Sequence, residues 1–115
     1  MPRKEKEEDR TSRRVSVSKA VRIRCENWER FQTEYTGNIS DTGIFITTEQ
    51  PLSPGTVFTL EMSVGEETIV AKAQVIWTKE FAPFEKRLSG LGARFVDMDP
   101  QSERILQDWI ADLRV

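Results

Sequence analysis

The sequence predicts an all-β domain: a six-stranded antiparallel barrel, closed or split, followed by one C-terminal α-helix. Apolar and polar residues alternate with a period of two along most of the chain after residue 14, which is typical of strands with one buried face. Proline, glycine and asparagine interrupt these runs at short intervals, as in sheets with tight connections. A chain of 115 residues suits one domain, and closing its sheet into a barrel hides the strand edges.

The first strand is predicted over residues 15–25. Its apolar parity comprises Val15, Val17, Val21, Ile23 and Cys25. Lys19 interrupts this parity and indicates a bend. The place of Cys25 on the buried parity predicts an inert core thiol, and a lone cysteine forms no disulfide within the chain. A turn follows at 26–29, in which Trp28 is expected to be packed or half-exposed.

A second strand is predicted over residues 31–36, where two sets of side chains alternate. Gly37 ends this strand or forms a bulge in it. Residues 38–43 are expected to form a polar turn, because asparagine, serine, aspartate and glycine are common turn formers. A third strand follows at 44–48.

The fourth and fifth strands are predicted at 57–64 and 68–78, joined by a tight connection. One side of the fifth strand carries Ile69, Ala71, Ala73, Val75 and Trp77. Trp77 is therefore expected in the core. Residues 79–89 are charged and contain a proline, which indicates a loop, and a sixth strand covers 91–95.

The end of the chain switches to helical spacing. Asp99 is a favourable N-cap, and Pro100 suits the first helical position. The apolar stripe comprises Ile105, Leu106, Trp109, Ile110 and Leu113. Because so short a helix is marginal alone, the stripe is expected to dock on the strands, with Trp109 in the core.

The amino-acid composition excludes several classes of function. The chain has no histidine, which removes the commonest general base and every nucleophile pair that depends on it. A single cysteine also excludes a cysteine-rich zinc site. We therefore assign no catalytic residue and no metal ligand, and expect a binding protein rather than an enzyme. No stretch approaches the ~20 apolar residues of a membrane span, and the N-terminus has no apolar signal region, so we expect a cytoplasmic protein without membrane insertion.

Charge is unevenly distributed along the chain. The formal net charge is −2, yet residues 1–14 hold six basic and four acidic side chains and the remainder carries −4. No aliphatic or aromatic residue lies between Pro2 and Val15, so this arm is expected to be disordered when alone. We place the disordered arm at 1–9 and the domain at 10–115. An acidic body disfavours DNA or RNA as partners, because nucleic-acid binding requires a broad basic face.

Two short motifs carry chemistry suited to recognition. Arg10 and Arg14 form an Arg-x-x-x-Arg motif, and Asn38, Ser40 and Gly43 form an Asn-x-Ser-x-x-Gly motif, with 23 residues between Arg14 and Asn38. Guanidinium groups make paired hydrogen bonds to guanine O6 and N7, stack on bases and bind phosphate. The arginines therefore suit a small anionic ligand, which needs only a few well-placed cations.

In this order and on this strand pattern, the motifs resemble those of the PilZ domain family, bacterial receptors for the second messenger cyclic di-GMP. The family's signature is RxxxR followed by [D/N]xSxxG. The resemblance extends to the segments 44–48, 51–55, 75–77 and 92–95, and covers roughly residues 9–113.

The resemblance implies a barrel of PilZ type that binds cyclic di-GMP and needs no other cofactor. The implied ligand-binding residues are Arg10, Arg13, Arg14, Asn38, Ser40 and Gly43. In this interpretation Asn38 bonds a guanine edge, Ser40 offers its hydroxyl to a base or phosphate, and Gly43 lets the backbone approach the ligand. Arg13, between the two motif arginines, is expected to add a phosphate contact.

We expect the ligand to bridge the arginine arm to the face formed by residues 38–43 and so to order the arm. The ordered arm then presents a surface to a protein effector, since no output domain is evident in the sequence. A monomer or weak dimer is expected.

One alternative is an interaction module of the same fold that no longer binds cyclic di-GMP and acts in motility or surface-structure assembly. In that case the arginines form a solvated tail, and residues 38–43 are an ordinary β-turn. A small-barrel nucleic-acid binder is a further alternative, which the acidic body disfavours.

Overall fold

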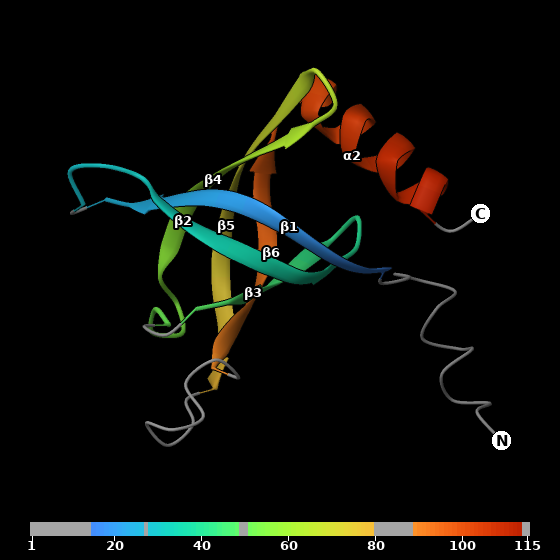
Figure 1. Ribbon diagram of the computed structural model, residues 1–115. Helices are drawn as coiled ribbons and strands as arrows, with labels where there is room; N and C mark the ends of the chain where they lie inside the picture. Colours follow the sequence, from blue (N-terminus) through green and yellow to red (C-terminus); the bar gives the residue numbers. More distant parts are fainter. Residues whose placement is uncertain (1–14, 27, 49–50, 80–88, 114–115) are drawn as a thin grey trace, which may run out of the picture.

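The protein is a closed six-stranded barrel with one helix, seen in a computed structural model that describes residues 15–26, 28–48, 51–79 and 89–113 (Figure 1). The elements are β1 (Val15–Cys25), β2 (Gln32–Ile39), β3 (Gly43–Thr47), β4 (Val57–Val64), β5 (Glu67–Lys79), β6 (Gly90–Met98) and α2 (Pro100–Leu113). Every strand pairing is antiparallel, in the order β1-β2-β3-β6-β5-β4 around the barrel. The predicted fold class is thereby confirmed, in its closed form.

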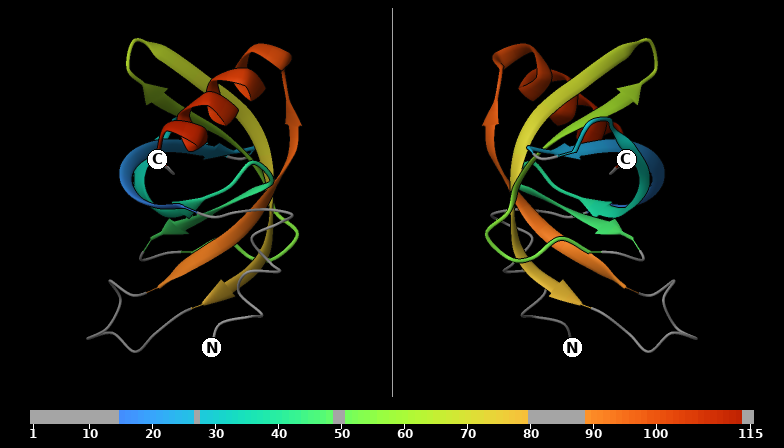
Figure 2. Two further views of the ribbon diagram at one scale, coloured as in Figure 1. Left: turned by 90° about the vertical axis from the view of Figure 1, so that its right-hand side faces the viewer. Right: turned by 90° about the vertical axis from the view of Figure 1, so that its left-hand side faces the viewer.

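One apolar core fills the interior of the barrel. The buried apolar side chains of the strands are Val21, Ile23, Cys25, Ile39, Ile44, Ile46, Phe58, Leu60, Met62, Ile69, Ala71, Ala73, Val75, Leu91 and Ala93. Most of them alternate with outward-facing residues, so the two-residue period of the sequence becomes the inner face of a closed sheet. Figure 2 shows α2 lying across one end of the barrel, where it extends this core.

Helix α2 begins at a well-formed cap. The backbone N–H of Ser102 donates to Asp99 Oδ1 at 2.7 Å, which confirms the predicted N-cap. Ser102 Oγ in turn accepts the backbone N–H of Val70 at 3.1 Å and so ties the first turn of the helix to β5. This contact joins a backbone donor of the barrel to the helix cap.

The predicted apolar stripe of α2 docks on the barrel over most of its length. Ile105, Leu106 and Ile110 are buried, and Trp109 is half-buried with Lys19 Nζ at 5.8 Å from its ring centroid. Leu113 was expected in the same contact but is 40% exposed at the last residue of the helix.

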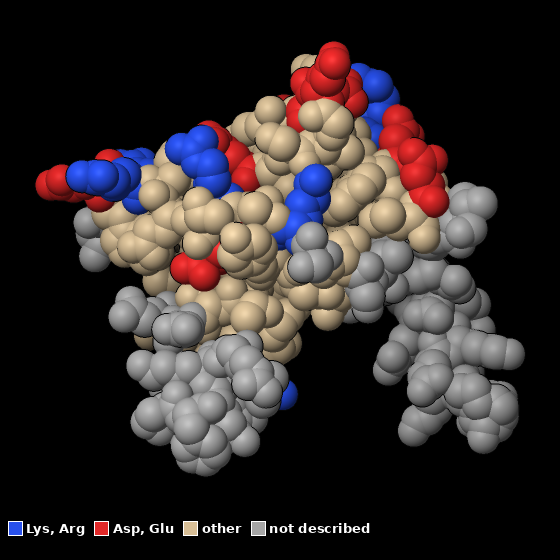
Figure 3. Space-filling view, in the orientation of Figure 1, with Lys and Arg blue, Asp and Glu red and all other residues tan. Residues whose placement is uncertain are grey.

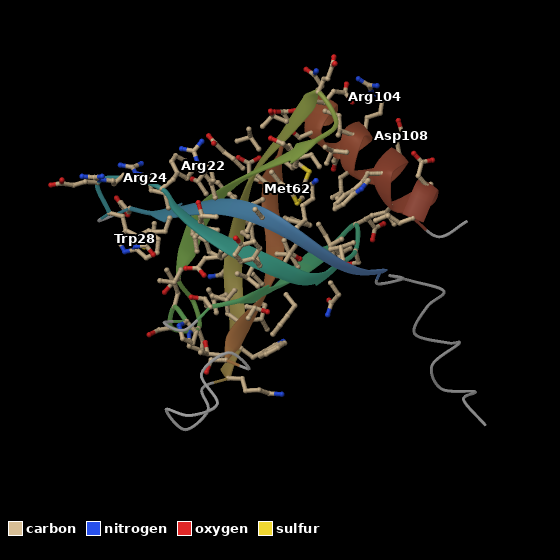
Figure 4. All side chains as sticks on the ribbon, viewed as in Figure 1. Arg22, Arg24, Trp28, Met62, Arg104 and Asp108 are labelled. Carbon is tan, nitrogen blue, oxygen red and sulfur yellow. The ribbon has the colours of Figure 1, made fainter. Side chains whose placement is uncertain are left out.

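The opposite face of α2 is polar. Arg104 and Asp108 project from the side of the helix that faces away from the barrel (Figure 4). Met62, by contrast, is 2% exposed and lies on the barrel side, so α2 separates solvent from core.

The second strand is longer than predicted. Gly37 does not end it: the pairing of β2 with β3 shifts between Thr36 and Asn38, so Gly37 is a bulge and β2 continues to Ile39. The predicted turn at 38–43 therefore shrinks to Ser40–Thr42, and Gly43 already belongs to β3. A bulge reverses the facing of the residues after it, which is why alternation alone misplaced this boundary.

A bulge also separates β5 from the predicted pattern. The pairing of β5 with β6 shifts between Val75 and Trp77, where Ile76 is an extra residue of β5, and between Lys72 and Ala73, where the extra residue, Val96, lies in β6. The first shift places Ile76 and Trp77 outside, at 50% and 44% exposure. The prediction that Trp77 lies in the core is wrong, because the extra residue moves its side chain to the outer surface.

The remaining predictions for single residues concern β1 and the turn that follows it. A register shift between Ser16 and Lys19 confirms the bend in β1. Cys25 is buried, and this burial raises the pKa of its thiol against the smaller, opposite effects of a backbone hydrogen bond and of Arg24. The thiol therefore stays protonated at neutral pH, as expected of a core residue. Trp28 is half-buried against the core, as predicted.

Charged side chains of the described residues gather at the tip of the β1–β2 hairpin and along α2, with much of the surface between them uncharged (Figure 3). Arg22 and Arg24 project from β1 near that tip (Figure 4). Arg22 pairs with Glu61 of β4 at 3.0 Å and lies over the Phe31 ring at 4.7 Å. These exposed contacts fix the hairpin surface but contribute little to stability.

Replacing Asp99 with alanine is expected to lower the free energy of unfolding by about 1 kcal/mol, because the first turn of α2 loses its capping oxygen. Urea denaturation followed by circular dichroism measures this change. The Asp99→Asn variant is the matched control, since asparagine keeps a capping oxygen and should retain most of the stability. An equal loss in both variants would contradict the role of the hydrogen bond.

Candidate functional site

The pairing of β1 with β2 brings the start of β1 beside the β2–β3 turn. Val15, the first described residue, pairs with Ile39, which directly precedes the β2–β3 turn. The arginine motif lies immediately before Val15 in the chain, so its attachment point is beside this turn. Outside the described residues lie Arg10, Arg13 and Arg14.

Ser40 holds the β2–β3 turn together. Its side chain is 0% exposed, and its Oγ accepts the backbone N–H groups of Thr42 and Gly43, both at 3.2 Å. The backbone N–H of Ser40 donates to the carbonyl of Gly43 at 2.9 Å. Serine is suited to this role because its short side chain reaches the backbone two and three residues ahead. The structure thus places the Ser40 hydroxyl inside the turn, and leaves Asp41 and Thr42 exposed.

Gly43 begins β3 beside a described cation. It is buried and pairs with Arg94 of β6, whose side chain is exposed. The turn backbone and a guanidinium-bearing residue therefore occupy adjacent strands. This arrangement combines backbone donors with a positive charge, which suits an anionic group.

Asn38 faces outward from β2. The next residue, Ile39, is 0% exposed, so strand alternation places Asn38 on the outer face, where it is half-buried. Thr36 Oγ1 lies 3.2 Å from the carbonyl oxygen of Asn38 and 3.1 Å from that of Phe45. The threonine hydroxyl thereby fixes the bulge that determines where Asn38 points.

Phe45 and Trp77 form an aromatic platform on the same outer face. Their ring centroids are 5.5 Å apart with an interplanar angle of 23°, which is a stacked geometry. Phe45 comes from β3 and Trp77 from β5, and both pair with Gly92 of β6 between them. The platform thus spans three adjacent strands beside Asn38, the cross-strand partner of Phe45.

Glycine is required beneath the platform. A Cβ at Gly92 would lie 2.3 Å from the Trp77 ring, and a Cβ at Gly37 or Gly90 would lie 2.7 or 2.6 Å from the Phe45 ring. Each distance is far below van der Waals contact. These glycines therefore let two large rings lie against the barrel wall.

Two open hollows adjoin Trp77 and Gly92. The smaller, of about 380 Å³, is lined by Asn38, Phe45, Trp77 and Gly92 and carries no charged side chain. The larger, of about 680 Å³, runs along β6 past the β2–β3 turn. Its charged lining residues are Asp41, Arg94, Asp97 and Glu103. An uncharged aromatic hollow beside Asn38 thus continues into a polar groove beside Gly43.

The structure brings Asn38, Ser40 and Gly43 into one turn region, as the motif predicted, and adds three residues that the sequence did not single out for the site. Phe45 and Trp77 were counted among strand residues, and Arg94 was noted only for its resemblance. The close glycines in β6 were a signal for a flat ring above the strand, because glycine in a strand marks a close approach. The bulge that turns Trp77 outward left no such signal.

The described residues show no feature of a metal centre or a membrane span. In these ranges no group of three or more histidine, cysteine, aspartate or glutamate side chains is placed to hold a metal ion. Nor is any helix there long and apolar enough to cross a bilayer. What the site offers is an aromatic surface, an amide, turn backbone and a cation, all of which are suited to binding.

Comparisons with known proteins agree with this architecture. The sequence matches the family model of the PilZ domain over residues 8–112. The PilZ domain of YcgR from Escherichia coli, solved with c-di-GMP, superposes with a TM-score of 0.69 at 21% identity, covering 90% of this chain and 89% of that one. The PilZ domain of CeSA from a cellulose-synthesizing bacterium gives 0.67 at 15% identity, covering 89% and 98%.

A longer protein is similar over part of its length. The Bacillus subtilis inhibitor of motility (MotI/DgrA) superposes with a TM-score of 0.71 at 17% identity, covering 88% of this chain and 49% of that one. The chain therefore spans about half the length of that protein. No curated protein sequence matches significantly. Since the family match extends over nearly the whole chain, and the barrel aligns along most of two solved PilZ domains, the chain belongs to the PilZ domain family.

Proposed function

We propose that this protein is a receptor for cyclic di-GMP, which it binds between its arginine motif and the outer face of β2, β3 and β6. The pairing of Val15 with Ile39 carries the proposal, because it attaches the arginines beside the turn that holds the second motif. The solved structures of the YcgR PilZ domain and of MrkH, both with c-di-GMP, support this ligand class.

A short tether keeps the arginines near the turn. Arg14 directly precedes Val15 and Arg10 lies five residues before it. An extended chain covers at most about 3.6 Å per residue, so the Cα of Arg10 lies within roughly 18 Å of that of Val15. Within this radius the guanidinium groups bind guanine O6 and N7 or the phosphates of the ligand. Arg13 adds a phosphate contact.

The outer face provides the complementary surface. One guanine stacks against the platform of Phe45 and Trp77, and Asn38 bonds the edge of that base. Gly43 admits the ligand close to the backbone, and Arg94 offsets phosphate charge. Because the other charged residues of the groove are acidic, the arm arginines and Arg94 carry the attraction for the anion.

Ser40 acts on the ligand through the shape of the turn. Its Oγ is engaged by Thr42 and Gly43, so its contribution is to orient the backbone and side chains that meet the ligand. A direct hydrogen bond from the Ser40 hydroxyl to a base or phosphate requires that turn to rearrange.

The binding of the ligand is signalled to a protein effector. Binding fixes the arm against the barrel, which has an entropic cost and creates a new surface. Motility is a candidate process, in keeping with the name of the similar inhibitor of motility. The alternative, a PilZ-type interaction module without ligand, predicts partner binding that cyclic di-GMP does not alter.

Isothermal titration of the wild-type chain with cyclic di-GMP is expected to show saturable binding, and the Arg14→Ala variant should bind at least tenfold more weakly. A hydrogen bond to a charged group contributes about 1.5–3 kcal/mol, which sets this expectation. Arg24→Ala is the matched control, since Arg24 is an exposed arginine of β1 that lies near the hairpin tip, at the far end of the strand from the arginine motif. Absence of wild-type binding overturns the function, whereas equal binding by Arg14→Ala overturns the arginine assignment.

Replacing Trp77 with alanine is expected to weaken cyclic di-GMP binding by about ten- to a hundredfold, with a loss of about 1 kcal/mol in the free energy of unfolding from the stacked contact with Phe45. Stacking of a base on an aromatic ring contributes about 1–3 kcal/mol, and this ring is 44% exposed, outside the core. Val57→Ala serves as control, because Val57 is 45% exposed and lines neither hollow. Unchanged affinity in Trp77→Ala would show that the platform does not contact the ligand.

A further inference from the structure

We infer that the base position beside Asn38 accepts adenine as well as guanine, so that the protein also binds a mixed cyclic dinucleotide of one guanosine and one adenosine. The inference rests on the proposed function and narrows its ligand class. It follows from which polar group lines the aromatic hollow.

Asn38 supplies the polar side chain of that hollow. The other lining residues are Phe45, Trp77 and Gly92, which have only apolar or aromatic side-chain surface apart from the indole N–H. A base stacked on the Phe45–Trp77 platform therefore meets one amide at its edge. The identity of the base is decided by what this amide tolerates.

An amide matches both purines. Its oxygen accepts and its NH₂ donates, so it makes two hydrogen bonds with N1–H and O6 of guanine. With adenine it makes two with the N6 amino group and either N1 or N7. A carboxylate accepts only, so it pairs twice with the N1–H and N2 amino group of guanine but meets the lone pair of adenine N1. An asparagine at this position therefore accepts both purines, whereas an aspartate would favour guanine over adenine.

No carboxylate restores that discrimination in the hollow. Asp41, in the adjacent turn, lines the larger groove with Arg94 rather than the hollow with Asn38. The platform does not discriminate either, because every base has a π-face and stacking is tolerant of sequence. The described residues that line the hollow with Asn38 therefore include no carboxylate that selects guanine.

The position of the second base remains selective for guanine. Arginine donates to O6 and N7 of guanine, whereas the N6 amino group of adenine opposes a guanidinium donor. The arm arginines consequently require one guanine. Two adenines leave one base without this pairing, so cyclic di-AMP is expected to bind weakly.

The test titrates the full chain with three ligands: cyclic di-GMP, cyclic GMP–AMP and cyclic di-AMP. The expected result is binding of the mixed ligand within about tenfold of cyclic di-GMP, with cyclic di-AMP weaker by about ten- to a hundredfold. The wild-type chain alone decides the inference, so it does not depend on how a variant folds.

Two substitutions then locate the effect. Asn38→Asp is expected to shift the preference toward cyclic di-GMP over the mixed ligand by about ten- to a hundredfold, since one bidentate pair discriminates by about that factor. Asp41→Asn, its control in the neighbouring turn, should leave the preference unchanged. A preference that moves with Asp41 rather than Asn38 overturns the assignment.

The outcomes separate the two proposals. Wild-type binding of cyclic di-GMP with more than hundredfold rejection of the mixed ligand overturns the inference and leaves the proposed function intact. Equal binding of all three ligands overturns it too, because the site then reads no base. Absence of binding by any of the three overturns the proposed function, and the inference with it.

Discussion

In a closed antiparallel barrel each strand residue faces either the core or the solvent, and one inserted residue reverses that facing for the residues that follow it. The proposed binding surface of this protein depends on this constraint. The bulge at Gly37 lets Ile39 enter the core and turns Asn38 outward, and the bulge at Ile76 turns Trp77 outward. Without these shifts the same residues would alternate into different positions, and no polar and aromatic surface would lie beside the turn.

The barrel supplies rigidity on which the site is built. Thr36 bonds both carbonyls at the first bulge, and Ser40 closes the following turn from within. Gly92 lets the Trp77 ring lie against the barrel wall, and Gly37 and Gly90 do the same for the Phe45 ring. Each of these contacts places a group without touching a ligand itself. In the proposed function, recognition is divided between this preorganised face and the arginine motif before β1, and any ordering of that motif on binding has an entropic cost that the ligand must offset.

Charge and hydrogen-bonding pattern divide the work of recognition. Because the body is acidic and Arg94 is the one described cation that lines the larger groove, the proposed function assigns the attraction for an anion to Arg94 and to the arginine motif. Base identity depends on which donors and acceptors meet each edge. In the proposed arrangement, an amide at position 38 and guanidinium groups of the arginine motif make different demands, so the two bases of one ligand would be read with different stringency.

The sequence by itself determined the barrel class, the six strands and the capped helix, because these follow from local periodicity and from residues such as Asp99 that act within one turn. It also predicted the PilZ family and the two motifs, since both are contiguous in the chain. Only the tertiary structure decided that Trp77 lies outside, that Phe45 stacks on it, and that the Ser40 hydroxyl lies within its own turn. Bulges and contacts between strands depend on pairing across the sheet, which leaves no period in a single strand's sequence.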